Sequence, residues 1–99
     1  MTERTLRQRL AELLREQEAD ALELSQALGI AEKDVYAHLE HIQRSAAAAG
    51  GALVVTPSEC LACGYVFADR GRLTRPGRCP RCRGTRVSRP SFRIRRLRF

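Results

Sequence analysis

Four cysteines in the second half of the chain constrain the fold more than any other feature. They form two C-x2-C pairs, Cys60 with Cys63 and Cys79 with Cys82, separated by fifteen residues. A two-residue spacing lets one tight turn direct both sulfurs at one ion, and two such turns make a closed tetrahedral site. The pattern predicts one structural Zn²⁺ held by four thiolates. Iron is the alternative, because paired turns of this kind also suit a rubredoxin-like site.

A coordination sphere filled by protein leaves no position for a water molecule, so a hydrolytic role is not expected. The sequence also shows no pairing of a nucleophile with a base and no glycine loop for phosphate binding. We therefore expect that the protein is not an enzyme and has no small-molecule substrate. In a chain of 99 residues, the metal is expected to be a requirement for folding, because short segments bury little apolar surface.

Charge is divided unevenly between the two halves. Residues 1–50 carry six basic and nine acidic side chains, a net charge of −3, whereas residues 51–99 carry twelve arginines against Glu59 and Asp69, a net charge of +10. Four thiolates on one divalent ion would reduce the second value by about two charges. Biased composition and solubility are the simpler explanation, but they do not account for charge confined to one half. The asymmetry indicates a polyanionic partner, most often nucleic acid.

The first segment is predicted to be an amphipathic helix. Thr5 and Gln8, three residues apart, can form a capping box, although Thr2 is an equally good start. The apolar residues recur at i, i+4, i+7 and i+8, which places one stripe on a helix: Leu6, Leu10, Leu13 and Leu14.

Two further helices with the spacing of a helix-turn-helix are predicted between residues 20 and 50. Asp20 and Glu23 give a start signal for the shorter helix, and Gly29 ends it. The longer helix runs from about residue 32 to residue 48. The residues expected to pack the two helices against each other are Leu24, Ala27, Leu28, Ile30, Val35, Leu39 and Ile42.

Strands are predicted in three places after Gly51. Residues 52–57, "ALVVTP", are β-branched and end at a proline, and residues 65–68, "YVFA", form a second apolar run. Residues 91–95, "SFRIR", alternate apolar and basic side chains, with a bulge or the strand end expected at Arg95 and Arg96. The domain boundary is placed between residues 56 and 57.

Residues 21–42, "ALELSQALGIAEKDVYAHLEHI", resemble the winged helix-turn-helix of prokaryotic regulators, whose consensus runs roughly L-A-x-x-L-G-I-S-x-x-T-V-S-R-H-L. The strand at 52–57 stands where a wing would begin, and a four-cysteine ribbon follows. The whole chain thus resembles a family of small predicted transcriptional regulators that fuse these two parts. The resemblance implies an α+β fold, with a three-helix winged helix-turn-helix domain over 1–56 and a small antiparallel β zinc ribbon over 57–99.

The resemblance also implies a DNA-binding transcriptional regulator, with the third helix in the major groove of double-stranded DNA. The predicted DNA contacts are Lys33, Tyr36, His38, His41 and Arg44 on that helix and Arg70, Arg72, Arg75, Arg78, Arg81 and Arg83 in the ribbon.

The third helix departs from the consensus in several places. Ala31 stands where relatives often have a serine cap, and Asp34 and Ala37 replace residues that commonly meet DNA. Together with Glu32 and Glu40, Asp34 puts negative charge on or near the face that would approach phosphates.

These departures keep a second hypothesis open, in which the chain is a protein-interaction or assembly module of the transcription or translation machinery. RNA binding through the arginine-rich ribbon is a third hypothesis. An apolar surface on the first helix would serve a homodimer. The start "MTERTLRQRL" has no apolar core, and the longest uncharged run, residues 45–58, is too short to span a bilayer. A cytoplasmic location without membrane association is therefore expected.

Overall fold

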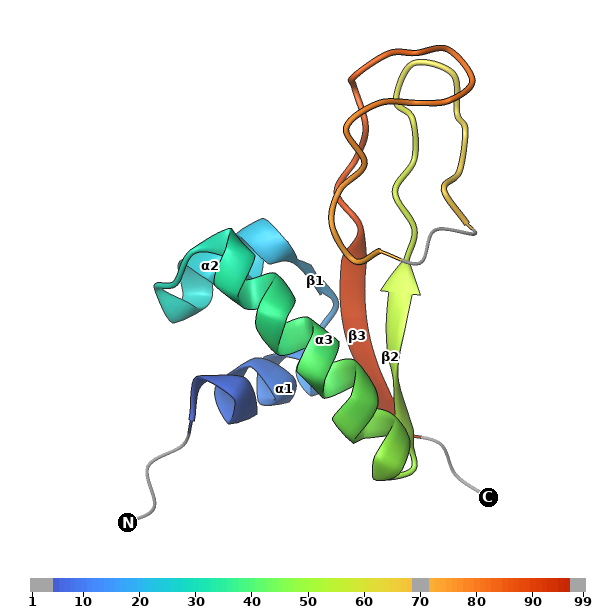
Figure 1. Ribbon diagram of the computed structural model, residues 1–99. Coiled ribbons are helices and arrows are strands. Elements are labelled where there is room, and N and C mark those ends of the chain that lie inside the picture. The colour runs from blue at the N-terminus through green and yellow to red at the C-terminus, as the bar shows by residue number, and fades with distance from the viewer. Residues whose placement is uncertain (1–4, 69–71, 97–99) are drawn as a thin grey trace.

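The computed structural model describes residues 5–68 and 72–96 and shows three helices followed by a small antiparallel sheet (Figure 1). The predicted α+β class is confirmed. The elements are α1 (Leu6–Glu16), β1 (Ala19–Asp20), α2 (Ala21–Leu28), α3 (Glu32–Ala48), β2 (Gly51–Thr56) and β3 (Ser91–Arg96).

Capping interactions between residues close in the sequence fix the ends of the first two helices. In α1 the N–H of Gln8 donates to Oγ1 of Thr5 at 3.1 Å, while the N–H of Thr5 donates to Oε1 of Gln8 at 2.9 Å. Asp20 and Glu23 form the same reciprocal box at the start of α2, at 2.8 and 3.0 Å. Gly29 ends α2 with φ +67°, a left-handed conformation that favours glycine. These start and stop signals were predicted from the sequence.

β3 is the central strand of the sheet, whose order is β1-β3-β2. β3 pairs antiparallel with β2 in continuous register from Thr56 opposite Ser91 to Gly51 opposite Arg96, so the strand runs through Arg96 without a bulge. A Cβ atom on Gly51 would lie 2.9 Å from the carbonyl oxygen of Arg95, so this close pairing requires a glycine. β1, which the sequence did not predict, pairs with the start of β3.

The hydrophobic core lies between the helices and one face of the sheet. Phe92 of β3 is fully buried within this core, which also contains side chains from all three helices. Leu28 and Ile30 are half-buried and pack against this core, whereas Ala27, predicted to pack between α2 and α3, is exposed. The buried members of the core are Leu10, Leu14, Ala19, Ala21, Leu24, Val35, Leu39, Ile42, Leu53, Leu73 and Phe92.

The ribbon is an insertion between two paired strands. The chain leaves the sheet at Thr56, runs through residues 57–90, and returns opposite the same position at Ser91. Figure 1 shows this segment projecting beyond the ends of β2 and β3, which makes the molecule elongated, with extents of 52 × 35 × 19 Å. Residues 91–96, which follow the ribbon in the sequence, pair with β1 and β2, and Phe92 is buried in the same core as the helices.

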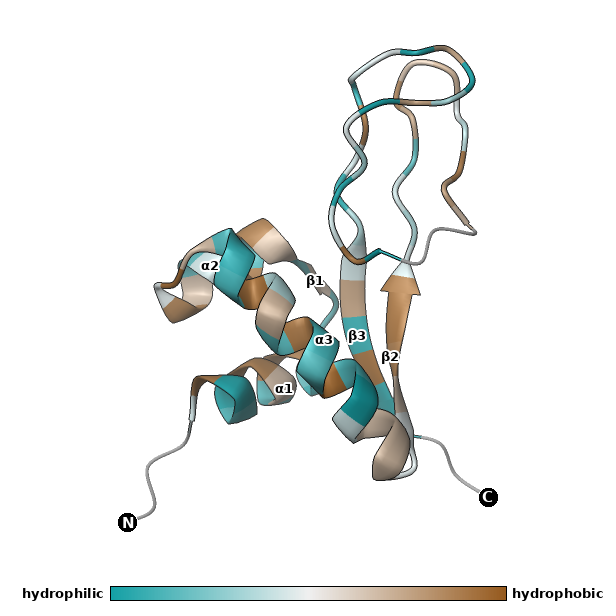
Figure 2. Cartoon of the chain, in the orientation of Figure 1, coloured by the Kyte–Doolittle hydropathy of each residue, from teal (hydrophilic) through white to brown (hydrophobic). Residues whose placement is uncertain are grey.

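Most of the ribbon has no regular secondary structure. The strand predicted at residues 65–68 is reduced to one bridge, Val66 with Glu59, and a second bridge joins Cys60 to Val87. The rings of Tyr65 and Phe67 pack edge to face, with centroids 5.0 Å apart. In Figure 2 the projecting loops are largely hydrophilic or intermediate in hydropathy.

Among the residues that the structure describes, no helix is long and apolar enough to cross a membrane.

Candidate metal centre and nucleic-acid interface

The four cysteine sulfurs converge within the ribbon. All four Sγ atoms lie within 4.8 Å of one another. Sγ of Cys60 lies 3.5 Å from that of Cys82, and Sγ of Cys63 lies 3.6 Å from that of Cys79. A tetrahedral zinc site with Zn–S bonds of about 2.3 Å needs sulfurs about 3.8 Å apart, so the cluster fits the ion.

The first C-x2-C turn is closed by two backbone hydrogen bonds. The N–H of Gly64 donates to the carbonyl of Cys60 at 2.8 Å, and the N–H of Cys60 donates to the carbonyl of Tyr65 at 2.7 Å. Gly64 has φ +80°, a left-handed conformation that glycine adopts at little cost. The residue after the second cysteine of the pair thus sets the direction in which the chain leaves the turn.

The second turn repeats this pattern with an arginine in place of the glycine. The N–H of Arg83 donates to the carbonyl of Cys79 at 2.9 Å, and the N–H of Cys79 donates to the carbonyl of Gly84 at 2.9 Å. Arg83 adopts φ +64°, and it is the one non-glycine residue with positive φ in the described part of the chain. Gly84 has a different role: its N–H donates to Sγ of Cys82 at 3.4 Å, and an added Cβ would lie 3.3 Å from that sulfur.

Backbone N–H groups directed at the sulfurs favour thiolates. Hydrogen bonding from the N–H of Cys63 is the main cause that lowers the pKa of Cys60 to about 6. Burial opposes ionisation of Cys79, but backbone N–H groups, including that of Arg81 at 3.3 Å, outweigh it and lower the pKa. The N–H of Tyr65 favours the Cys63 thiolate, but burial and the other sulfurs raise its pKa to about 12. A divalent cation resolves this conflict, because it offsets the repulsion among four thiolates.

The ribbon is joined to the start of α3 by an ion pair and to the hydrophobic core by a buried leucine. Nη1 of Arg89 lies 3.0 Å from Oε1 of Glu32, and Leu73 is a buried member of the core. Tyr36 is half-buried at this junction, where burial and the Glu32 carboxylate raise its pKa while the Arg89 charge and the backbone of Arg75 oppose the shift. Tyr36, one of the predicted DNA contacts, thus lies half-buried at the junction, and Arg89 neutralises the Glu32 charge.

The exposed face of α3 carries charges of both signs. Lys33, Ala37, Glu40 and Arg44 are exposed and share one stripe, because their spacings of four, three and four residues follow the helical period. Asp34 is exposed beside them. The structure therefore leaves Lys33 and Arg44 as the basic groups of this stripe, with Glu40 between them.

The two histidines lie on the flank of α3, and both are half-buried. Nδ1 of His38 is buried and has no hydrogen-bond partner among the described residues. Burial is the main cause that lowers the pKa of His41, and the nearby charges of Arg7 and Arg44 add to it. The cluster of potential metal ligands found in the described part of the chain contains the four cysteines and neither histidine.

The ribbon arginines are mostly open to solvent. Of the predicted contacts, Arg70 lies outside the described residues, and the exposed ones are Arg72, Arg75, Arg78, Arg81 and Arg83.

Reasoning from the sequence missed two features of this part of the molecule. The pairing of Arg89 with Glu32 joins residues 57 positions apart, which no local pattern reveals. The strained backbone of Arg83 could have been found by aligning the two turns, because it stands where the first turn has Gly64.

The comparisons with known proteins cover nearly the whole chain. A family model described as PF0610-like, N-terminal, matches residues 5–54, and one described as PF0610 rubredoxin-like zinc beta-ribbon domain matches residues 57–97. The solution NMR structure of protein PF0610 from Pyrococcus furiosus is similar over 98% of this chain and 97% of that chain, with a TM-score of 0.79 and 27% identity. No curated protein matches the chain significantly.

The matched ribbon and the clustered sulfurs together identify one zinc ion as the metal of this site, held by Cys60, Cys63, Cys79 and Cys82. The coordination sphere is filled by protein, so the ion is structural. The chain belongs to the PF0610-like family, whose N-terminal domain is followed by a rubredoxin-like zinc ribbon.

Proposed function

We propose that the protein is a DNA-binding transcriptional regulator of the winged helix-turn-helix type, with the zinc ribbon inserted between the two strands of the wing. The order of elements supports this proposal: α2, a turn at Gly29 and α3 form the helix-turn-helix, and β2 and β3 follow as wing strands. α3 then serves as the recognition helix.

The observation that carries the proposal is the position of the ribbon beside the first turns of α3. Recognition helices contact base edges with their N-terminal residues. The ion pair between Arg89 and Glu32 holds the ribbon at that end of the helix. A duplex that meets Lys33 and Ala37 on the exposed stripe would therefore also come close to the ribbon.

Charge strengthens this argument. Residues 57–90 contain eight arginines and two acidic residues, a net charge of +6, or about +4 once four thiolates bind one Zn²⁺. Exposed arginines at this density favour contact with phosphates, which positions a protein on a duplex without specifying sequence. Sequence readout would then depend on the short stripe of α3.

Selection of bound sequences from random duplexes tests the proposal. We expect zinc-loaded protein to enrich one sequence, and a palindrome would show that it binds as a dimer. The affinity for the enriched duplex should fall steeply with salt, because each phosphate contact releases a counterion. Absence of binding even at low salt would refute DNA binding.

A pair of identical substitutions on α3 separates readout from folding. Ala37→Glu places a carboxylate at the centre of the exposed stripe, and we expect it to reduce affinity for the selected duplex at least tenfold. Ala48→Glu makes the same change at the far end of the same helix, where residues are also exposed, and should weaken binding much less. Equal losses in both variants would argue against a recognition role for α3.

A protein-interaction or assembly role is the second candidate, favoured by apolar side chains on the ribbon. Leu61 is 60% exposed in the first cysteine turn and Val66 is 47% exposed shortly after it. Apolar side chains that the metal site keeps exposed to water are suited to contact with another protein. Recovery of one stoichiometric partner after nuclease treatment, lost in Leu61→Ser, would favour this function over DNA binding.

A further inference from the structure

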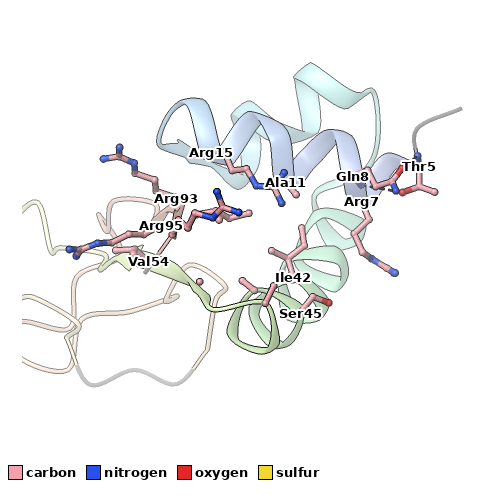
Figure 3. Close-up of a pocket in the computed structure, with 15 residues that line it drawn as sticks. Thr5, Arg7, Gln8, Ala11, Arg15, Ile42, Ser45, Val54, Arg93 and Arg95 are labelled. Atoms are coloured by element: carbon pink, nitrogen blue, oxygen red, sulfur yellow. Dashed lines mark hydrogen bonds between the residues drawn. The ribbon is translucent and has the colours of Figure 1, made fainter. Parts of the chain in front are cut away.

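A groove lies behind α3, on the side away from the exposed stripe. It has a volume of about 1160 Å³, and α1, the C-terminal part of α3 and strands β2 and β3 supply its walls (Figure 3). Ile42 and Ala46 line it, and each lies two residues from Arg44, which at 100° per residue places them about 160° from the exposed stripe. A duplex on that stripe therefore does not reach the groove.

The groove is strongly basic. Fifteen described residues line it, and none of them is acidic. In Figure 3, Arg7 lies toward one end, next to Thr5 and Gln8. The ion pair between Arg89 and Glu32 involves none of the lining residues. The five arginines of the lining are Arg7, Arg15, Arg93, Arg95 and Arg96.

The rest of the lining is mostly apolar, with Thr5, Gln8 and Ser45 as its neutral polar side chains. α1 contributes Ala11, α3 contributes Ile42 and Ala46, and the strands contribute Val54 and Ile94. A floor of this kind offers little to a bare phosphate ion, which keeps its hydration in water. It suits a ligand that removes apolar surface from water while its charged end meets guanidinium groups.

We propose that this groove binds a small organic anion with an apolar body, of the class of aliphatic and aromatic carboxylates. The planar guanidinium of arginine matches a carboxylate with two parallel hydrogen bonds. A bound anion also relieves the mutual repulsion of the clustered arginines. The volume is sufficient, because pockets for drug-sized ligands span about 300–1,000 Å³. The inference does not depend on DNA binding, since it concerns the opposite side of α3.

Ligand binding is tested on the full, zinc-loaded chain with 8-anilinonaphthalene-1-sulfonate, an aromatic anion that fluoresces in apolar sites, as the probe. Octanoate below its micellar concentration should displace the probe. Octanol has a similar apolar body without the charge, and acetate has the charge without the body, so each should be at least tenfold weaker. Displacement by octanol as effective as by octanoate would overturn the assignment, and so would equally effective displacement by acetate.

Two double variants locate the site. Arg15→Gln with Arg95→Gln removes two cations from the groove, and we expect octanoate to bind at least tenfold more weakly. Arg81→Gln with Arg86→Gln removes the same charge from exposed positions in the ribbon and should change affinity less than twofold. Thermal melts show whether each variant is folded. In ¹H–¹⁵N spectra, octanoate should shift the amides of Ala46 and Ala49. Shifts confined to the ribbon would overturn the proposal.

Discussion

The largest fully buried side chains of the described protein differ in kind between its two regions. Around the helices they are apolar, and Leu10, Leu39 and Phe92 belong to one core. In residues 57–90 they are Cys60 and Cys79, two of the zinc ligands. In Figure 2 the helices and strands carry both hydrophobic and hydrophilic colour, whereas the projecting loops are mainly hydrophilic or intermediate.

The difference shows how a chain of this size can support two folding mechanisms. The helical part buries enough apolar surface to be stabilised by the hydrophobic effect. The ribbon does not, and its one buried leucine, Leu73, belongs to the helical core. A structural zinc ion supplies the missing free energy, which in zinc-finger peptides is about 10–16 kcal/mol. The ribbon should thus depend on metal, and the helical part on packing.

Removal of zinc should have the largest effect and tests this contrast directly. We expect chelation to abolish the fold of residues 57–90, because four unscreened sulfurs within 4.8 Å of one another repel once ionised. The helices should remain, since the open ribbon adds a loop-closure cost of only about 3 kcal/mol to the pairing of β2 with β3. Amide spectra recorded before and after chelation separate the two regions.

Cys79→Ser provides a genetic control for chelation, because it removes one buried ligand and no helical contact. It should reproduce the loss of ribbon signals with helical circular dichroism retained. Complete loss of helical signal in either experiment would show that the two regions fold as one unit.

Phe92→Ala should have the next largest effect, and in the opposite region. Phe92 is fully buried in the core, and truncation of a buried phenylalanine costs about 3–5 kcal/mol. Denaturant unfolding followed by helical circular dichroism measures the loss. Arg93→Ala, at the exposed neighbouring position, should change stability by less than about 0.5 kcal/mol. If Phe92→Ala released zinc as readily as it unfolded the helices, the ribbon and the helical part would not differ in what stabilises them.

The two cysteine turns allow a finer comparison within the ribbon. Gly64→Ala should destabilise the ribbon by about 1–2 kcal/mol, because alanine at φ +80° is strained even though its Cβ meets nothing within 4 Å. Arg83→Gly should stabilise it by about 0.5–1 kcal/mol by removing the same strain from the second turn. Both effects can be measured as changes in zinc affinity, by competition with a chelator of known affinity. Changes of the same sign would show that the turns are not equivalent.

The smallest effect is expected at the junction of the two regions. Glu32 and Arg89 keep 35% and 25% of their side-chain surface exposed, so their coupling should be only about 0.2–1 kcal/mol. A double-mutant cycle with Glu32→Gln and Arg89→Gln isolates it. Arg86→Gln, at an exposed position, should show no coupling to Glu32→Gln. Coupling above about 2 kcal/mol would mean that the ribbon and α3 are far more tightly joined than the exposed ion pair indicates.

Features that depend on neighbouring residues could be predicted from the sequence. The capping boxes at Thr5 and Asp20 and the left-handed Gly29 arise within a few positions, and the structure confirms each. The spacing of the cysteines predicted the metal cluster for the same reason, since each turn is local and only two turns had to meet. The apolar period also placed α3 correctly, from Glu32 to Ala48.

Features that depend on distant residues could not be predicted in the same way. β1 has two residues, Ala19 and Asp20, too few to show any period, and it exists because β3 pairs with it. The alternation of "SFRIR" indicated a strand but not that its partner lies on the far side of the ribbon. The exposure of Ala27 depends on how α2 and α3 cross, which the apolar pattern alone does not specify.

The pairing of Thr56 with Ser91 has a consequence for how such chains evolve. The two ends of the ribbon meet where an ordinary hairpin would have its turn, so the host strands need only a short connection. Excision of residues 57–90 would leave the order and direction of every helix and strand unchanged. Lineages could therefore exchange or lose the zinc-bearing part while keeping the helical topology, provided that the core position of Leu73 is repacked.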